Sequence, residues 1–301
     1  MWKTINDILV NIDNFVWGIP LMVLILAGGI LLTVRLGVMQ FRKLPLALKW
    51  MVKNEEGGEG EISSFSALCT ALSATIGTGN IVGVATAIAA GGPGALFWMW
   101  IAALLGTATK YSECLLAIKY RVVAKDGHIV GGPFYYIENG MGEKWKWLAK
   151  IFAFFGVGVG LLGIGTFTQI NGITSAVNNF FDPQNTWTVE LFGRTYSWTV
   201  VIAGILLTLC VALVIIRGIK LYVVVVLIIL FTHLSAIPGA IVEIVQSAFG
   251  LRAAAGGTLG SILIAMQMGI ARGIFSNEAG LGSAPIAAAA AKTNEPVTQG
   301  L

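Results

Sequence analysis

Residues 73–83 read SATIGTGNIVG, and they lie within a segment that carries no charged residue from Ile62 to Thr109. This segment is long enough for two helices that cross a bilayer, because each needs about 20 apolar residues. Gly91-Gly92-Pro93-Gly94 predicts the turn between them. Residues 77–80 are poor helix formers inside the first of these spans. We therefore expect that helix to break at GTGN.

A broken helix leaves main-chain groups unpaired, which a membrane tolerates only where they line a cavity inside protein. The N–H groups that begin one half-helix suit a carboxylate, and the C=O groups that end the other suit a cation. The break at residues 77–80 thus predicts a site for an amino acid with Na⁺. The same small residues also fit a second interpretation, a face for close helix packing.

The composition of the whole chain agrees with a membrane protein. Apolar residues make up 56%, charged residues 11%, and the mean hydropathy is +0.82, whereas soluble domains contain about 25% charged residues. A soluble enzyme, a disordered chain and a disulfide scaffold are excluded. Long apolar runs predict seven helical spans, and hence an all-α polytopic membrane protein: residues 15–34, two within 62–116, then 151–181, 195–216, 221–242 and 253–291. They are uncharged except for Lys110 and Glu113 in the third and Arg272 and Glu278 in the last.

The distribution of Lys and Arg predicts the orientation in the plasma (inner) membrane. Alternating the spans collects fifteen basic residues on one side and leaves three on the other, namely Lys3, Arg194 and Arg252. Cytoplasmic loops carry the excess, so we expect the N-terminus outside and the C-terminal end of the chain in the cytoplasm. This asymmetry also explains the positive net charge without a nucleic-acid partner. Residues 41–52 predict an amphipathic helix on the cytoplasmic surface, and residues 55–61 a linker.

A second candidate break lies at residues 266–285, which read MQMGIARGIFSNEAGLGSAP. Its glycines, at positions 269, 273, 280 and 282, alternate with charged and amide side chains. Charges inside a membrane span are costly and point to function. Arg272 and Glu278 fit a gating or structural ion pair, if the chain between them is not straight helix, and equally fit direct contact with a substrate. Two interrupted helices five spans apart are typical of inverted-repeat transporters.

Five motifs together resemble the alanine or glycine:cation symporter (sodium:alanine symporter) family: GTGNIVG at 77–83, GGPGA at 91–95, FWMW at 97–100, GGP at 131–133 and GIFSNEAGLGSAP at 273–285. The resemblance covers the chain from about Asp13 onward. It implies import of alanine or glycine driven by Na⁺, through alternating access in a LeuT-type five-plus-five inverted repeat.

The resemblance also implies an organisation for the chain. Residues 1–61 then hold an extra peripheral helix, the surface helix and the linker; residues 62–250 form the first repeat of five spans; and residues 251–301 begin the second repeat with its broken helix. Members of this family carry four more spans, so we expect a C-terminally truncated member, and a non-transporting fragment is one alternative.

The resemblance further implies the site residues. The ends of the amino acid are held by the two broken helices, through Gly77, Thr78, Gly79, Asn80, Gly269, Ser276 and Asn277. The candidate walls of the side-chain pocket are Phe167, Gln169, Met268 and Phe275. Gln169 also fits a hydrogen bond to a neighbouring helix. Oxygen ligands for Na⁺ are available at Thr75, Gly77 and Asn80.

Two other functions deserve comparison with sodium symport. Proton coupling needs a titratable group in the membrane, and the spans offer few carboxylates: Glu113, Glu243 and Glu278. An enzyme needs a nucleophile with its base, or a metal cluster. The two histidines, His128 and His233, stand apart from any such arrangement. We therefore expect a transporter without enzymatic activity or cofactor, whose partners are a small amino acid, Na⁺ and the bilayer.

Overall fold

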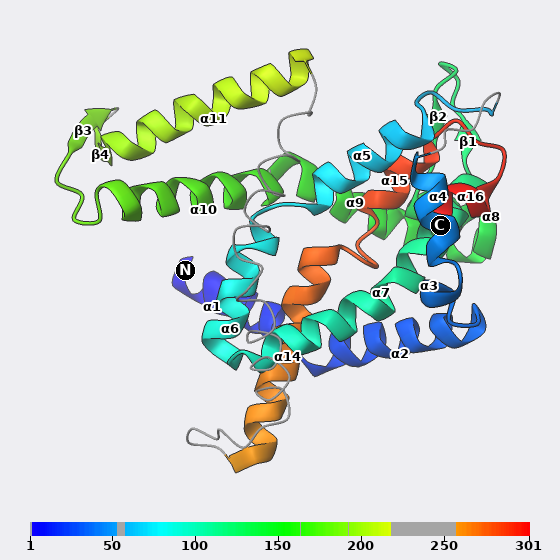
Figure 1. Cartoon of the computed structure of the whole chain (residues 1–301), viewed down its shortest axis with the longest axis horizontal. Coiled ribbons are helices and arrows are strands. Elements are labelled where there is room, and N and C mark those ends of the chain that lie inside the picture. Colours follow the sequence, from blue (N-terminus) through cyan, green and yellow to red (C-terminus); the bar gives the residue numbers. More distant parts are fainter. Residues whose placement is uncertain (1, 53–57, 163, 192, 218–256) are drawn as a thin grey trace. The chain divides into compact units, whose positions relative to one another are not determined.

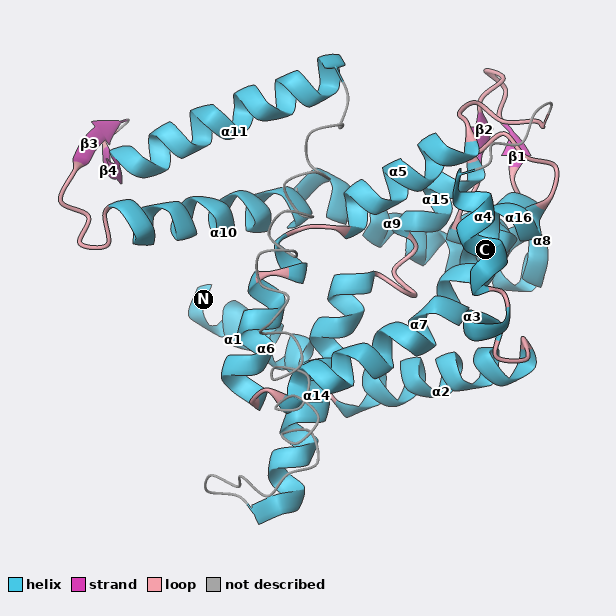
Figure 2. Ribbon diagram, viewed as in Figure 1, coloured by secondary structure: helices cyan, strands magenta, loops and turns pink. Residues whose placement is uncertain are grey.

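The computed structural model describes residues 2–52, 58–162, 164–191, 193–217 and 257–301 (Figures 1 and 2). The described chain is helical apart from two short hairpins and connecting loops. Its contacts divide it into two compact units, one made of residues 1–158 and 244–301 and the other of residues 159–243. Each unit is described here by itself.

The first unit begins with two helices rather than one. Helix α1 covers Trp2–Val16 and α2 covers Ile19–Arg35. Helix α2 therefore begins later than residue 15, where the predicted span begins. Gly18 lies between them because a Cβ there would come within 2.9 Å of the Asn14 carbonyl oxygen. The expected surface helix is divided at Lys43 into α3, Met39–Arg42, and α4, Leu44–Val52.

The predicted break in the next helix is present. Helix α5 covers Ser64–Thr75, a single 3-10 turn covers Thr78–Asn80, and α6 covers Val82–Gly91. The Ser63 hydroxyl begins α5 by accepting the N–H of Ser66 at 3.1 Å. Gly92 ends α6 with φ +74°, a backbone conformation that favours glycine. Helix α7, Gly94–Lys119, follows the predicted turn directly.

Several short elements and one long helix follow α7. They are a hairpin, an amphipathic helix that starts at the predicted Pro133, a 3-10 turn, and then the next long helix. Their bounds are β1, Val122–Val123; β2, Ile129–Val130; α8, Pro133–Met141; Glu143–Trp145; and α9, Lys146–Leu162. The hairpin pairs Val122 with Val130 and Val123 with Ile129.

The C-terminal helices are α14, Gly257–Asn277; α15, Ser283–Ala289; and α16, Pro296–Gly300. All three pack against α7, which also contacts α2 and α6. The core between α7, α14 and α2 contains Ala102, Ile270, Ile274 and Met22, all at most 8% exposed. Burial of these apolar side chains holds the first unit together.

The described part of the second unit is a helical hairpin with a small sheet at its tip (Figure 2). Helix α10, Ile164–Phe181, packs against α11, Trp198–Arg217, and β3, Thr188–Leu191, pairs with β4, Arg194–Ser197. Asp182, 7% exposed, organises the loop by accepting the N–H groups of Thr186 and Trp187 at 2.8 and 3.0 Å. These hydrogen bonds lower the pKa of the Asp182 carboxyl.

The helical class predicted from composition is confirmed. Within the described ranges, two helical segments, Lys3–Arg35 and Gly94–Lys119, are long and apolar enough to cross a membrane, and Ser64–Thr75, Val82–Gly91 and Trp198–Leu209 are shorter apolar helices. The run predicted as one span at 151–181 is helical in all its described residues, in α9 up to Leu162 and in α10 from Ile164. The span predicted at 221–242 lies outside the described residues. The inverted repeat, the three-part domain division and the orientation remain predictions.

Candidate functional site

Asn80 closes the break between α5 and α6. Its backbone N–H donates to the Gly77 carbonyl at 3.0 Å, and its side-chain Nδ2 donates to the Thr75 carbonyl at 2.9 Å. The Thr75 hydroxyl is turned back along α5 and donates to Ala71 O at 2.9 Å. The backbone oxygens of Thr75 and Gly77 therefore lie around Asn80, the third of the three predicted Na⁺ ligands.

The break is fastened to α14 through two of the predicted substrate residues. The Ser276 hydroxyl donates to Oδ1 of Asn80, which joins positions 196 residues apart in the sequence. Gly79 packs beside Phe275, because a Cβ at Gly79 would meet the ring Cδ1 at 3.1 Å. Asn80 and Ser276 are both half-buried. The structure thus brings the first break and the end of α14 to one place.

Helix polarity gives this place a distinct electrostatic character. Both α5 and α14 end here, at Thr75 and Asn277. Helix C-termini carry partial negative charge from unpaired carbonyl groups, which favours a cation. Helix α6 begins on the other side of the break, at Val82, and its first N–H groups favour an anion. The helix interrupted between α5 and α6 therefore offers a cation a place at the end of α5 and an anion a place at the start of α6.

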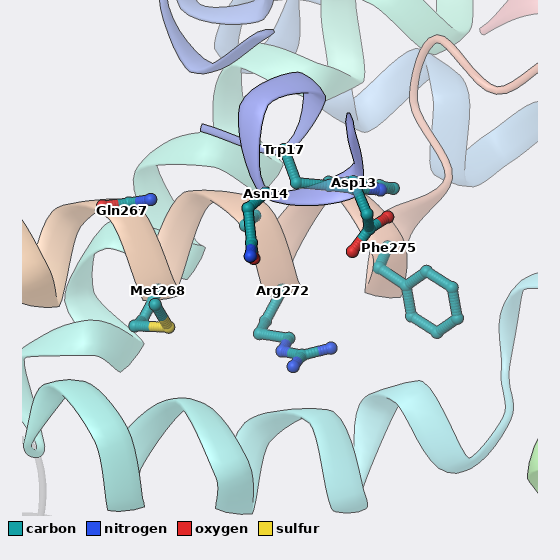
Figure 3. A pocket seen from close by; sticks show the side chains of 8 residues that line it. Asp13, Asn14, Trp17, Gln267, Met268, Arg272 and Phe275 are labelled. Atoms are coloured by element: carbon teal, nitrogen blue, oxygen red, sulfur yellow. The ribbon is translucent and has the colours of Figure 1, made fainter. Parts of the chain in front are cut away.

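A cavity of about 330 Å³ lies next to the break along α14. Met268, Arg272 and Phe275, all predicted site residues, line it together with Gln267 and Ala271 of the same helix and with Asp13, Asn14 and Trp17 of the N-terminal segment. Figure 3 shows Arg272 and Phe275 extending from the same side of α14, with the Asp13 carboxylate nearby. The cavity therefore contains both an acidic and a basic side chain.

The second interruption lies at residues 278–282, in the C-terminal half of the range predicted at 266–285. Helix α14 continues through Gly269 and Gly273 to Asn277, and the chain leaves helical geometry at residues 278–282. Glu278, Gly280 and Gly282 have φ of +53°, +87° and +85°. The two earlier glycines instead allow close packing: a Cβ at Gly269 would lie 2.2 Å from the Ala95 carbonyl oxygen.

The expected pairing of Arg272 with Glu278 is absent, since the chain between them stays helical to Asn277 and no ion pair joins these two described residues. Glu278 accepts the Ser283 hydroxyl instead, and Arg272 is exposed in the cavity. Asn277 stabilises the interruption locally, because its Oδ1 accepts the N–H of Ala279 at 2.8 Å. A gating role for Arg272 and Glu278 remains a prediction.

Two charged residues that the sequence analysis did not assign to the site contact the second interruption. Lys110 Nζ of α7 donates to the Glu278 carbonyl at 3.1 Å, and the Glu113 carboxylate accepts the N–H of Gly280 at 3.2 Å. Glu113 is 8% exposed. The feature of the sequence that could have indicated this role is the pair of charged residues, Lys110 and Glu113, near the end of an otherwise apolar span.

The remaining predicted site residues lie in both compact units. Thr78 contributes its backbone to the 3-10 turn, and Met268 packs near Gly91 of α6. Phe167 and Gln169 lie on α10 in the second unit, so their part in the site remains a prediction. Across the described ranges, no three His, Cys, Asp or Glu side chains are grouped so as to hold a metal ion.

At one end of the first unit, Arg121 joins the segment before α5 to the segment around the end of α15. Its guanidinium donates to the carbonyl groups of Glu59, Ala289, Ala291 and Thr293 at 2.8–3.1 Å. Ile62 forms a parallel bridge with Ala291, and the Lys292 N–H donates to Ile62 O at 2.7 Å. Partial burial lowers the pKa of Arg121. The two interrupted helices are thus fixed to each other at the ends that lie away from their interruptions.

Comparison with known proteins gives a consistent answer. The model of the sodium:alanine symporter family matches residues 2–301. A Haemophilus influenzae protein named an uncharacterized transporter is 53% identical over 99% of this chain and 65% of its own length. The sodium/alanine symporter AgcS of Methanococcus maripaludis is 45% identical over 97% of this chain and 65% of its length. The probable sodium/glutamine symporter GlnT of Bacillus subtilis is 38% identical over the whole chain and 62% of its length. The chain therefore spans 62–65% of the length of these relatives.

Proposed function

Because the chain belongs to the sodium:alanine symporter family, we propose that it acts in Na⁺-coupled import of alanine or glycine by alternating access. The observation that carries the proposal is the interruption of a helix at residues 76–81 and its connection to α14 through Asn80 and Ser276. Paired interrupted helices are the place where transporters of the inverted-repeat class bind substrate and coupling ion.

In this proposal Na⁺ binds among neutral oxygens where two helices end. The backbone carbonyls of Thr75 and Gly77 and the side-chain oxygens of Asn80 and Ser276 lie within one hydrogen-bonded group. A hard monovalent cation needs only such oxygens, and the partial negative charge of the α5 and α14 ends adds to the attraction. Cation binding would then replace the hydrogen bonds that Asn80 donates to the Thr75 and Gly77 carbonyls.

The amino acid then binds with its carboxylate at the start of α6 and its ammonium group toward the same carbonyl ends that attract Na⁺. Phe275, 42% exposed beside Gly79, offers an apolar wall for a small side chain. The cavity lined by Asp13 and Arg272 serves as the approach to this site, because a guanidinium and a carboxylate complement the two ends of a zwitterion. The roles of Phe167 and Gln169 of α10 as pocket walls stay predictions from the family resemblance.

Alternating access requires the regions on either side of the site to open in turn. Arg121 itself and Lys292, in one of the segments that it fixes, are among the basic residues that predict the cytoplasmic side. We assign the Arg121 contacts to the inner end, and the cavity beside α1 to the outer end, of a carrier in the plasma membrane. Its five-plus-five repeat belongs to the same proposal.

The test is uptake of labelled alanine into proteoliposomes that contain the chain, with an imposed Na⁺ gradient. A parallel sample contains a chimera in which residues 1–301 replace the matching segment of the Methanococcus maripaludis relative. We expect uptake in Na⁺ that disappears when choline replaces Na⁺ at fixed pH. Uptake that persists in choline would refute sodium coupling. Competition by glycine, alanine and glutamine would then define the substrate.

Proton coupling is tested in the same vesicles with Glu278→Gln. Its carboxylate accepts the Ser283 hydroxyl, which the amide oxygen of glutamine can also accept. If sodium is the coupling ion, the pH dependence of uptake stays as in the wild type. A pH dependence that disappears in Glu278→Gln would favour proton coupling instead.

A further inference from the structure

The last turns of α7 hold the second interruption through its main chain. Lys110 Nζ donates to the Glu278 carbonyl at 3.1 Å, and the N–H of Gly280 donates to Oε2 of Glu113 at 3.2 Å. The two residues are three positions apart on α7, so they project from the same face of that helix. One cation and one anion therefore bind two backbone groups of a single short loop.

The Gly280 N–H needs such a partner because it lies outside a helix, and the Glu278 carbonyl, which also accepts the Leu281 N–H at 3.2 Å, gains a second donor from Lys110. Glu278 and Gly280 both have positive φ, and the helices on either side end at Asn277 and begin again at Ser283. An unpaired N–H or C=O group is costly where water is scarce. The Lys110 ammonium also lies at the C-terminal end of α14, where the helix dipole favours a positive charge.

The two charged groups hydrogen-bond to the loop and form no ion pair with each other. Ion pairs among the described residues join His128 to Glu61 and Lys146 to Glu138 and Glu143, and neither Lys110 nor Glu113 takes part in one. Glu113 is 8% exposed, although carboxylates are seldom buried unless they are paired. The Glu113 carboxylate contacts the second interruption through its hydrogen bond with the Gly280 N–H.

We propose that Lys110 and Glu113 are positioning residues for the transport site, an inference that rests on the function proposed above. By fixing residues 278–282 they set the position at which α14 ends, and therefore the position of Ser276, which donates to Asn80 across the first break. Gly106, one turn before Lys110, contributes to the same fit, since a Cβ there would meet Ala279 Cβ at 3.0 Å. Neither charged residue touches the amino acid or Na⁺ in this proposal.

The decisive comparison is Glu113→Ala against Glu113→Gln. Glutamine keeps an oxygen that accepts the Gly280 N–H, whereas alanine removes it and leaves that donor unpaired. We expect the KM for alanine, measured per folded carrier in the chimera, to rise about tenfold in Glu113→Ala and to stay within about twofold of the wild type in Glu113→Gln. Lys110→Met should resemble Glu113→Ala, and Lys110→Arg should resemble the wild type.

Hydrogen–deuterium exchange of the peptide that contains residues 278–282, on the 301-residue chain in micelles, gives a readout independent of transport. Glu113→Ala should exchange faster than the wild type, and Glu113→Gln at the wild-type rate. Wild-type KM and exchange in Glu113→Ala would overturn the proposal. Equal losses in the Gln and Ala variants would also overturn it, because the charge rather than the acceptor would then be required. If the wild type shows no Na⁺-driven uptake, the proposed function fails, whereas the exchange result still decides whether Glu113 positions the loop.

Discussion

Substitution of Gly269 by alanine tests whether α14 packs on α7 as closely as the structure shows. A Cβ at this position would lie 2.2 Å from the Ala95 carbonyl oxygen and 2.8 Å from Trp98 Cβ. Non-bonded atoms need more than 3 Å, so the two helices must separate by about 1 Å at this point. The clash involves main chain, which no side-chain rotation relieves, and the separation would disturb the neighbouring contacts of Ile270 and Ile274.

The expected cost follows from two opposing contributions. Overpacking of a well-filled interior costs about 1–3 kcal/mol, and a backbone clash belongs at the upper end of that range. Alanine in place of glycine inside a helix returns about 1 kcal/mol. We therefore expect Gly269→Ala to lower the free energy of unfolding by about 2 kcal/mol.

The assay is unfolding in mixed micelles by titration with SDS, followed by far-UV circular dichroism. Gly28→Ala in α2 is the matched control, because a Cβ there meets nothing within 4 Å. It should be neutral or stabilising by up to about 1 kcal/mol. Equal stability of the Gly269 and Gly28 variants would refute the close approach of α14 to α7.

Three further predictions concern other parts of the chain. Arg121→Gln removes a guanidinium that donates to four carbonyl groups, and it should lower the free energy of unfolding by about 2–3 kcal/mol in the same titration. The control Arg42→Gln loses a single exposed contact to Gly37 and should change the free energy of unfolding by less than about 1 kcal/mol. The N–H of Ile129, and to a smaller extent the His128 ring, hydrogen-bond to the Glu61 carboxylate and lower its pKa below the ordinary value. These hydrogen bonds therefore stabilise the β1–β2 hairpin above the ordinary carboxyl pKa, and the stabilisation is lost as the pH falls through the lowered pKa. Exchange protection of Ile129, corrected for the intrinsic rate, should therefore decrease in acid, and Glu61→Gln should abolish that dependence; protection unchanged at low pH contradicts it. Ser276→Ala leaves Oδ1 of Asn80 without its α14 donor and should weaken Na⁺-dependent alanine uptake about tenfold or more, whereas Ser73→Ala, which removes only a bond within α5, should leave uptake unchanged.

The first break was predictable because its cause is local. Residues 77–80 lack helix propensity whatever surrounds them, and Gly92 and Pro93 end one helix and start the next by their own backbone preferences. The structure confirms both features at the predicted positions. The helical class followed equally directly from the length of the uncharged runs.

The second interruption was harder to place because glycine has two uses. Gly269 and Gly273 allow a close approach to α7, whereas Gly280 and Gly282 adopt positive φ. The sequence shows four glycines among polar residues and does not reveal which of them faces Ala95. The contacts of Lys110 and Glu113 could not be predicted because they join residues 167 or more positions apart in the sequence. The four-residue strands β3 and β4 lacked a strong alternation of apolar and polar residues.

The central claim is that the break at residues 76–81 binds the amino acid with Na⁺, and a side chain introduced at Gly79 tests it most directly. Gly79→Leu places a branched side chain against the Phe275 ring, which a Cβ alone would meet at 3.1 Å. Gly83→Leu is the control in α6, where a Cβ meets nothing within 4 Å. We predict that Na⁺-dependent binding of labelled alanine is abolished in Gly79→Leu and retained in Gly83→Leu, at equal amounts of folded protein. Wild-type binding by Gly79→Leu would contradict the claim.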